Sequence, residues 1–231
     1  MPGSDDEVFE ELLAKSPFEE PSPFGEIMLH LDVAPASLQS RPSAIAALQA
    51  VVRQETSKYQ YLLSGDVSVE ITWHFHERDR YESDAGADID NLLKPMLDAF
   101  CGPDGLFIDD CQIRTLGISW ISTTAEQPAV TIQIKFIDSD FVPKAGIALV
   151  QIEKALCMPV DLKLPRRVQR IIFMMMRFQF AQRRFTEQVL GLDYYSARLF
   201  LPAQRRFHRT RLRDFNVMKP KEYRAALRQL P

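Results

Sequence analysis

Cysteine, glycine and long apolar runs are all scarce in this chain of 231 residues, and each scarcity excludes a class of protein. The three cysteines have no metal-like spacing and form no even set for disulfides, so we expect reduced thiols in a cytosolic protein. The nine glycines include no phosphate-cradling loop and no dinucleotide fingerprint, which disfavours nucleotide-cofactor enzymes. There is no Ser/His/Asp signature. No apolar run approaches a membrane span and the N-terminus is acidic rather than signal-like, so we expect no membrane association.

Charge is distributed unevenly along the chain. Residues 1–138 hold nine Lys/Arg and 24 Asp/Glu, a net charge of −15, whereas residues 139–231 hold 19 Lys/Arg and seven Asp/Glu, a net charge of +12. An acidic first part joined to a basic second part favours a nucleic-acid partner for the second part. The alternative is that the two parts attract each other, and both can hold.

Composition and apolar spacing divide the chain into three segments. We expect residues 1–24 to be an acidic flexible tail, with docking to a protein partner as a second interpretation. Residues 25–138 are predicted to form an α+β core. Its strands are expected where apolar residues follow one another or alternate with polar ones, and a helix is expected from Ser43, as its cap, to about Thr56. The predicted strands lie at residues 26–31, 67–75, 116–120 and 130–136.

Residues 139–231 are predicted to form a basic, mainly helical extension. A long helix is expected from Arg166 to about Gly191, with an apolar stripe formed by Val168, Ile171, Ile172 and Met175. Aromatic and basic residues then interleave from residue 194 to residue 213. Contacts of arginines with DNA phosphates, with the aromatics near unstacked bases, would explain this composition, and a solvated basic helix packing on the acidic part of the chain is the alternative. The candidate DNA-binding residues are Arg166, Arg167, Arg170, Arg205, Arg206, Arg209, Arg211 and Arg213.

The stretch from Asp84 to Asp110 carries the chemistry. It contains seven Asp and a single basic residue, Lys94, together with apolar residues that must pack. Packing therefore draws some carboxylates together near a core, which raises their pKa values or requires a cation. A hard divalent cation such as Mg²⁺, which prefers oxygen ligands, is the natural partner.

The spacing within this stretch indicates how the carboxylates meet. Asp88 and Asp90 stand two apart in an extended segment, so they point to the same side. Asp90 is predicted to cap a helix from about Asn91 to Cys101, on which Asp90 and Asp98 frame Lys94 at spacings of four. A Gly-Pro-Asp-Gly turn at residues 102–105 then delivers the pair at 109–110. A capped amphipathic helix with solvated Asp residues is the alternative.

The motif Asp88-x-Asp90-Asn91-Leu92-x-Lys94, followed by Asp98 and by Asp109-Asp110-x-Gln112, resembles the RusA family of Holliday-junction resolvases, or crossover-junction endodeoxyribonucleases. The resemblance covers about residues 25–138. It implies that Asp88, Asp90 and Asp110 are the catalytic, metal-binding carboxylates and that Lys94 is the essential lysine. It also implies supporting roles for Asn91, Asp98, Asp109 and Gln112.

The resemblance implies further properties of the protein as a whole. They are a small mixed sheet with helices, a homodimer, one or two Mg²⁺ ions per site, and paired cuts at four-way DNA junctions in recombination and repair. The expected location is cytoplasmic and nucleoid-associated, in a bacterial or phage setting. A catalytically silent or differently specialised branched-DNA-binding protein of the same fold is the alternative. The chain departs from the motif at Pro95, which disfavours α conformation at Lys94 and predicts a distorted first helical turn.

Overall fold

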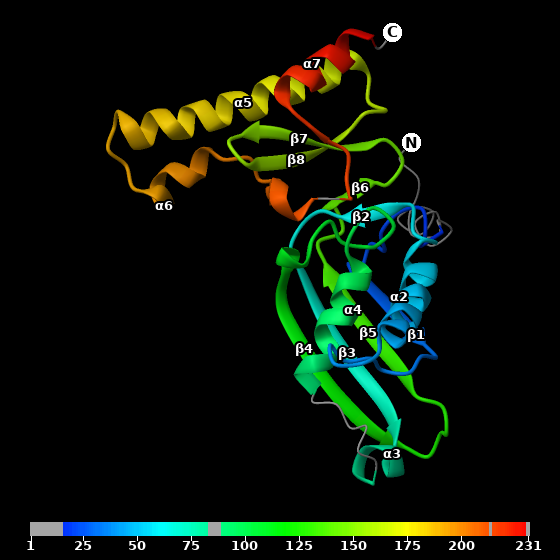
Figure 1. Cartoon of the computed structure of the whole chain (residues 1–231). Helices are drawn as coiled ribbons and strands as arrows, with labels where there is room; N and C mark the ends of the chain where they lie inside the picture. Colours follow the sequence, from blue (N-terminus) through cyan, green and yellow to red (C-terminus); the bar gives the residue numbers. More distant parts are fainter. Residues whose placement is uncertain (1–15, 83–88, 213, 230–231) are drawn as a thin grey trace, which may run out of the picture. The chain divides into compact units, whose positions relative to one another are not determined.

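The computed structural model describes residues 16–82, 89–212 and 214–229, and the chain divides into two compact units, residues 1–141 and 142–231. Each unit has a sheet and a hydrophobic core of its own (Figure 1). Helices and sheets occur together, which confirms the predicted α+β class. Within the described ranges, no helix combines the length and the apolar character that a membrane crossing requires.

The first unit is built on a four-stranded sheet in the order β1-β5-β3-β4. β5 pairs antiparallel with both β1 and β3, whereas β4 runs parallel to β3. A parallel pair needs a crossover connection, and the acidic motif lies in the crossover from β3 to β4. The alternation of apolar residues predicted all four strands, which are β1 (Glu26–Leu31), β3 (Val67–His76), β4 (Ile113–Thr123) and β5 (Ala129–Phe136).

Two helices, α2 (Pro42–Thr56) and α4 (Leu93–Phe100), lie against the sheet (Figure 1). Alternate residues of β3 from Val67 to Trp73 are buried in one cluster with Leu48 and Val52 of α2 and with Met96 and Phe100 of α4. The predicted cap of α2, Ser43, is not its cap. The helix begins with Pro42 at its first position, where the missing proline N–H removes no helical hydrogen bond.

Shorter elements complete this unit, and part of the expected tail joins its core. Phe18 packs edge-on against Tyr59 with 5.0 Å between ring centroids, and the Phe18 carbonyl accepts a 2.6 Å hydrogen bond from the N–H of Gln60. These contacts fix residues that we expected to be flexible, because an aromatic ring gains from burial beside other rings. Residues 1–15 lie outside the described part. The shorter elements are β2 (Tyr61–Leu63), α3 (Glu77–Tyr81), the 3₁₀ helices η1 (Ile89–Leu92) and η2 (Asp110–Gln112), and β6 (Phe141–Pro143), where the two units join along the chain.

The second unit has more helix than strand, as predicted, but it also contains a four-stranded sheet that the sequence analysis did not identify. A hairpin of β7 (Ile147–Glu153) and β8 (Leu156–Asp161) forms the centre of this sheet. Two-residue strands extend it on both sides, in the order β10-β7-β8-β9. The other elements are α5 (Arg166–Gln188), α6 (Tyr194–Ala197), η3 (Arg198–Phe200), β9 (Phe207–His208), η4 (Arg209–Arg211), β10 (Val217–Met218) and α7 (Pro220–Gln229).

Helix α5 confirms the long predicted helix, but the predicted stripe is not its buried face. Phe173, Met176 and Phe180 of α5 are buried with Val150 and Met158 of the hairpin. Val168, Ile171 and Met175 of the predicted stripe are instead exposed, as is Met174, whereas Ile172 is partly buried and packs against this cluster. The sheet against which the helix packs selects a face rotated away from most of the stripe. The exposed residues of α5 include Val168, Ile171, Met174, Met175 and Phe178.

Candidate active site

The helix that carries Lys94 begins differently from the prediction. Asp90 does not cap an α-helix but lies exposed within η1, and the α-helix runs from Leu93 to Phe100 rather than from Asn91 to Cys101. Pro95 explains the change. It has no N–H to bond to the carbonyl of Asn91, four residues earlier, so the first turn is tightened into a 3₁₀ helix.

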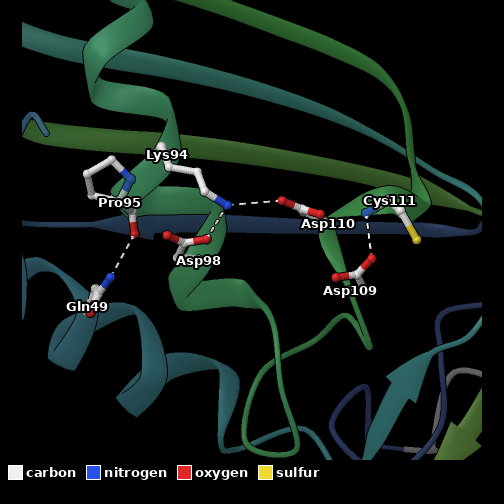
Figure 2. A network of polar contacts seen from close by, with 7 residues as sticks. All are labelled: Gln49, Lys94, Pro95, Asp98, Asp109, Asp110 and Cys111. Carbon is white, nitrogen blue, oxygen red and sulfur yellow. Dashed lines mark hydrogen bonds and ion pairs between the residues drawn. The ribbon is translucent and has the colours of Figure 1, made fainter. Parts of the chain in front are cut away.

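Backbone carbonyls in the turn around Pro95 accept hydrogen bonds from neighbouring segments. The carbonyl of Asn91 accepts a hydrogen bond from the N–H of Leu38 at 3.1 Å. The carbonyl of Pro95 accepts one from Nε2 of Gln49 in α2 at 3.4 Å (Figure 2). Both bonds hold the start of α4 against neighbouring segments, so the proline fixes the position of the turn that bears Lys94.

A tight turn after α4 returns the chain to the helix. The N–H groups of Leu106 and Phe107 both donate to the carbonyl of Phe100, at 2.8 and 2.9 Å. Gly105 lies so close to this carbonyl that any added Cβ would collide with it, and Gly102 has a φ of +103°. The predicted turn therefore has the expected effect: it places the pair at 109–110 beside the helix.

Gln112 fixes the second half of the motif. Its side chain is fully buried, and Oε1 accepts hydrogen bonds from the N–H groups of Ile108 and Asp109 at 2.7 and 3.0 Å. Its Nε2 donates to the carbonyls of Leu63 and Gly65, both at 2.8 Å. Asp109 caps η2, with Oδ2 accepting from the N–H of Cys111 at 3.2 Å. All four bonds of the Gln112 amide are thus used to hold the backbone that carries the two carboxylates.

Lys94 joins the two halves of the motif (Figure 2). Its Nζ lies 2.6 Å from Oδ1 of Asp98 and 3.1 Å from Oδ2 of Asp110. The hydrogen bond to Asp98 raises the pKa of the ammonium; partial burial acts against it, and the bond to Asp110 adds to the increase. Lys94 is therefore positively charged at neutral pH, and the structure brings together three of the residues that the motif singled out.

Cys101 lies close to the carboxylates around Lys94, and their negative charge affects its thiol. The sequence analysis did not predict this position. Burial raises the pKa of its thiol to about 12, and the negative charges of Asp110, Asp109 and Asp98 contribute to the increase. A thiol in this state stays protonated at neutral pH and is a poor metal ligand. Its position directly after the last residue of α4 was the one signal in the sequence that could have placed it here.

The other predicted site residues are not all brought together. Asp88 lies outside the described residues, and among those described no group of three or more His, Cys, Asp or Glu side chains is arranged to hold a metal ion. The candidate DNA-binding arginines are spread over several elements. Arg166, Arg167 and Arg170 lie on the first turns of α5, Arg205 and Arg206 lie before β9, Arg209 and Arg211 lie on η4, and Arg213 is outside the described residues.

Comparison with known proteins bears on the same segment. Residues 35–135 match the family model described as Endodeoxyribonuclease RusA, and this range contains η1, α4, η2 and the strands β3 and β4 that flank them. A search of curated proteins found no match to the chain. The match supports a RusA-family core at residues 35–135, as the acidic motif predicted.

Proposed function

We propose that the first unit is a Mg²⁺-dependent, structure-specific endonuclease that resolves four-way DNA junctions by paired phosphodiester cuts. The match of residues 35–135 to the RusA family model supports nuclease activity on branched DNA. The observation that carries the proposal is the convergence of Lys94, Asp98 and Asp110 from two separate elements of a RusA-family domain. A surface salt bridge contributes little to stability, so an arrangement of this kind points to chemistry rather than to folding.

The side chains gathered at this site suit a hard cation. Those that the structure brings to Lys94 are carboxylates, and the thiol of Cys101 in their field is kept protonated. Oxygen donors without thiolate favour Mg²⁺ over softer metals. Asp88, Asp90 and Asp110 are the residues proposed to hold one or two ions. When bound, Mg²⁺ would lower the pKa of a water ligand and neutralise charge on the phosphate.

Lys94 is proposed to act on the scissile phosphate. Its ammonium is held by two carboxylates and remains half exposed, so it is both oriented and accessible. A fixed positive charge of this kind stabilises negative charge that develops on the phosphate oxygens or on the leaving 3′ oxygen. Asp98 is then a positioning residue, because it anchors the lysine from one helical turn away.

We further propose that the protein acts as a homodimer, since two symmetric strands must be cut. Helix α5 presents exposed apolar residues with heptad spacing, which suits packing against the same helix of a second copy. Gln182 occupies the one polar position of the row. The exposed apolar residues are Val168, Ile171, Met175, Phe178, Phe185 and Val189.

The proposed activity can be tested on a labelled four-way junction with linear duplex as the control substrate. In Mg²⁺ we expect paired nicks near the branch point, absent in EDTA, absent on duplex, and absent for Asp110→Asn. Asp104→Asn is the matched control, because this carboxylate is exposed on the same acidic stretch but belongs to the turn. Uncut junction in every metal tested, with binding retained, would instead identify a catalytically silent branched-DNA-binding protein of the same fold.

A further inference from the structure

The second unit contains a groove lined by five arginines and three apolar residues. It lies between α5 and α7, which pack together in Figure 1, and encloses about 420 Å³. No Asp or Glu from the described part of the chain lines it. The lining residues are Arg166, Arg170, Phe173, Met174, Arg177, Arg224, Leu227 and Arg228.

The two helices place these arginines in register. Arg166, Arg170 and Arg177 are four and seven residues apart, so they share one side of α5, and Arg224 and Arg228 are four apart on α7. At a rise of about 1.5 Å per residue, the row on α5 extends over about 16 Å. The groove therefore offers cations along a line rather than at a point.

The groove is held by buried contacts beneath it. Gln169 is fully buried, and its Nε2 donates to the carbonyls of Leu162 and Leu164 at 2.9 and 2.6 Å. Its Oε1 accepts from the hydroxyl of Tyr223 in α7 at 3.1 Å, which ties the two helices together. The positions of the arginines thus depend on a rigid base.

Phe173 orients two of the arginines from below. The guanidiniums of Arg177 and Arg224 lie 6.0 and 5.7 Å from the centroid of its ring. Because this ring is almost fully buried under the two guanidiniums, it is not available for stacking on a nucleic-acid base. The groove can therefore contact a backbone but has no aromatic platform for bases.

The charges in the groove have no acidic partner among the described residues. None of its five guanidiniums forms an ion pair within the described residues, whereas Arg183 and Arg184 of the same helix pair with Glu187 and Glu153. Nε of Arg166 is buried without a hydrogen-bond partner there. The first turn of α5 also contains no acidic residue, although the positive end of a helix favours one. Such a concentration of like charge is relieved by binding an anion.

We propose that this groove binds the phosphate backbone of nucleic acid. The planar fork of Arg matches phosphate oxygens, and a backbone supplies the closely and regularly spaced charges that five guanidiniums on two neighbouring helices require. Recognition here is of the backbone and not of base sequence. The binding does not depend on whether the first unit cleaves DNA.

The test is a titration of fluorescein-labelled DNA duplex with the full-length chain in EDTA, followed by anisotropy at several salt concentrations. For Arg170→Ala/Arg177→Ala we expect an affinity loss of about tenfold or more at low salt and a salt dependence less steep by about two in log–log slope. Arg170→Lys/Arg177→Lys keeps both positive charges but lacks the planar guanidiniums, so we expect it to keep most of the salt slope and to lose part of the affinity. This result would show that the loss in the alanine variant comes from the removed charge and not from misfolding. Arg184→Ala/Arg198→Ala is the matched control, with equal charge removed from the same unit outside the groove.

Two results would overturn the proposal. One is a Kd and a salt slope for DNA that do not change in Arg170→Ala/Arg177→Ala. The other comes from a second titration with polyglutamate in place of DNA. If Arg170→Ala/Arg177→Ala loses binding to polyglutamate but keeps its binding to DNA, the ligand of the groove is an acidic protein segment. Since EDTA prevents metal-dependent cleavage, failure of the proposed nuclease activity leaves this test unaffected.

Discussion

Both units use a buried glutamine to position charged side chains, which are acidic in the first unit and basic in the second. In each, a fully buried glutamine donates to two backbone carbonyls and so fixes the segment that displays the charged side chains. Gln112 fixes the turn that carries Asp109 and Asp110, and Gln169 fixes the start of the helix that carries the arginine groove. Buried amides used in this way rigidify a segment without adding charge to it.

The units differ in how their charges are balanced. In the first, carboxylates that would repel one another are joined by Lys94. In the second, the groove arginines remain without carboxylate partners among the described residues. Under the two proposals, chemistry belongs to the acidic unit and phosphate binding to the basic unit, and the difference in charge balance fits that division.

Removing Lys94 gives the strongest test of this division. We expect Lys94→Met to reduce junction cleavage by about a hundredfold to a thousandfold, because a fixed charge at the phosphate is lost. Binding of DNA in EDTA should stay close to that of the wild type, since the groove in the second unit is unchanged. Single-turnover cleavage and anisotropy measure the two quantities. Equal losses in both would show that the tasks are not separate.

The two buried glutamines can be compared directly by Gln112→Leu and Gln169→Leu. Each change leaves polar groups without partners: two buried N–H groups and two buried carbonyls around residue 112, and two partly buried carbonyls and the buried Tyr223 hydroxyl around residue 169. At about 1–3 kcal/mol for an orphaned buried group, we expect a loss of about 3 kcal/mol or more for each, with Gln112→Leu the larger. Urea unfolding measures the loss, and exposed Gln127→Leu is the control. If either variant matches this control, the glutamine does not anchor its segment.

The exposed face of α5 tests whether the basic unit also joins two copies of the chain. Phe178→Glu places a charge in the middle of the apolar row and should raise the dimer Kd by about tenfold or more, as expected when an apolar contact is replaced by a charge that must be desolvated. Sedimentation equilibrium measures this, with Gln188→Glu as an exposed control on the same helix. An unchanged Kd would place the dimer contact elsewhere.

The smallest effect is expected for Tyr223→Phe, which removes one hydrogen bond from the base of the groove. We expect a loss of about 1 kcal/mol at pH 8. Burial raises the pKa of this phenol from 10.0 to about 12, so the unfolded chain ionises first as pH rises. Between pH 10 and 12 the wild type should therefore lose up to about 1.4 kcal/mol of stability per pH unit from this group.

The phenylalanine variant lacks this loss, so its deficit of about 1 kcal/mol in unfolding free energy should shrink above pH 10 and reverse in sign before pH 12. Urea unfolding of both proteins at several pH values between 8 and 12 measures it. A difference that stays constant over this range would show that Tyr223 does not titrate as proposed.

The strands of the first unit could be predicted because one face of its sheet is buried, so apolar residues alternate along β3 and β5. The second sheet could not. Four consecutive residues of β8 are buried, which hides the alternation, and the turn at Glu153-Lys154-Ala155 contains none of the usual hairpin residues. β9 and β10 are two residues each and leave no pattern.

The sequence predicted which residues form the candidate site better than it predicted how they are arranged. The spacing of Lys94 and Asp98 on a helix was enough to predict their ion pair, because residues four apart are neighbours. The capping role given to Asp90 failed, since Pro95 changes the turn in which it lies. The arginine groove depends on α7, whose start was signalled only by Pro220 at the first helical position and by Glu222 close behind it.

Pro95 has a consequence beyond the shape of a helical turn. Because proline has no N–H to donate to the carbonyl of Asn91, that oxygen always remains available to accept the hydrogen bond from the N–H of Leu38, 53 positions away in sequence. The loop before α2 is thereby tethered to the helix that aims Lys94. An alanine at this position would be a better helix former, but its N–H would compete with Leu38 for the same acceptor. A residue that weakens the helix locally thus couples a distant loop to the lysine.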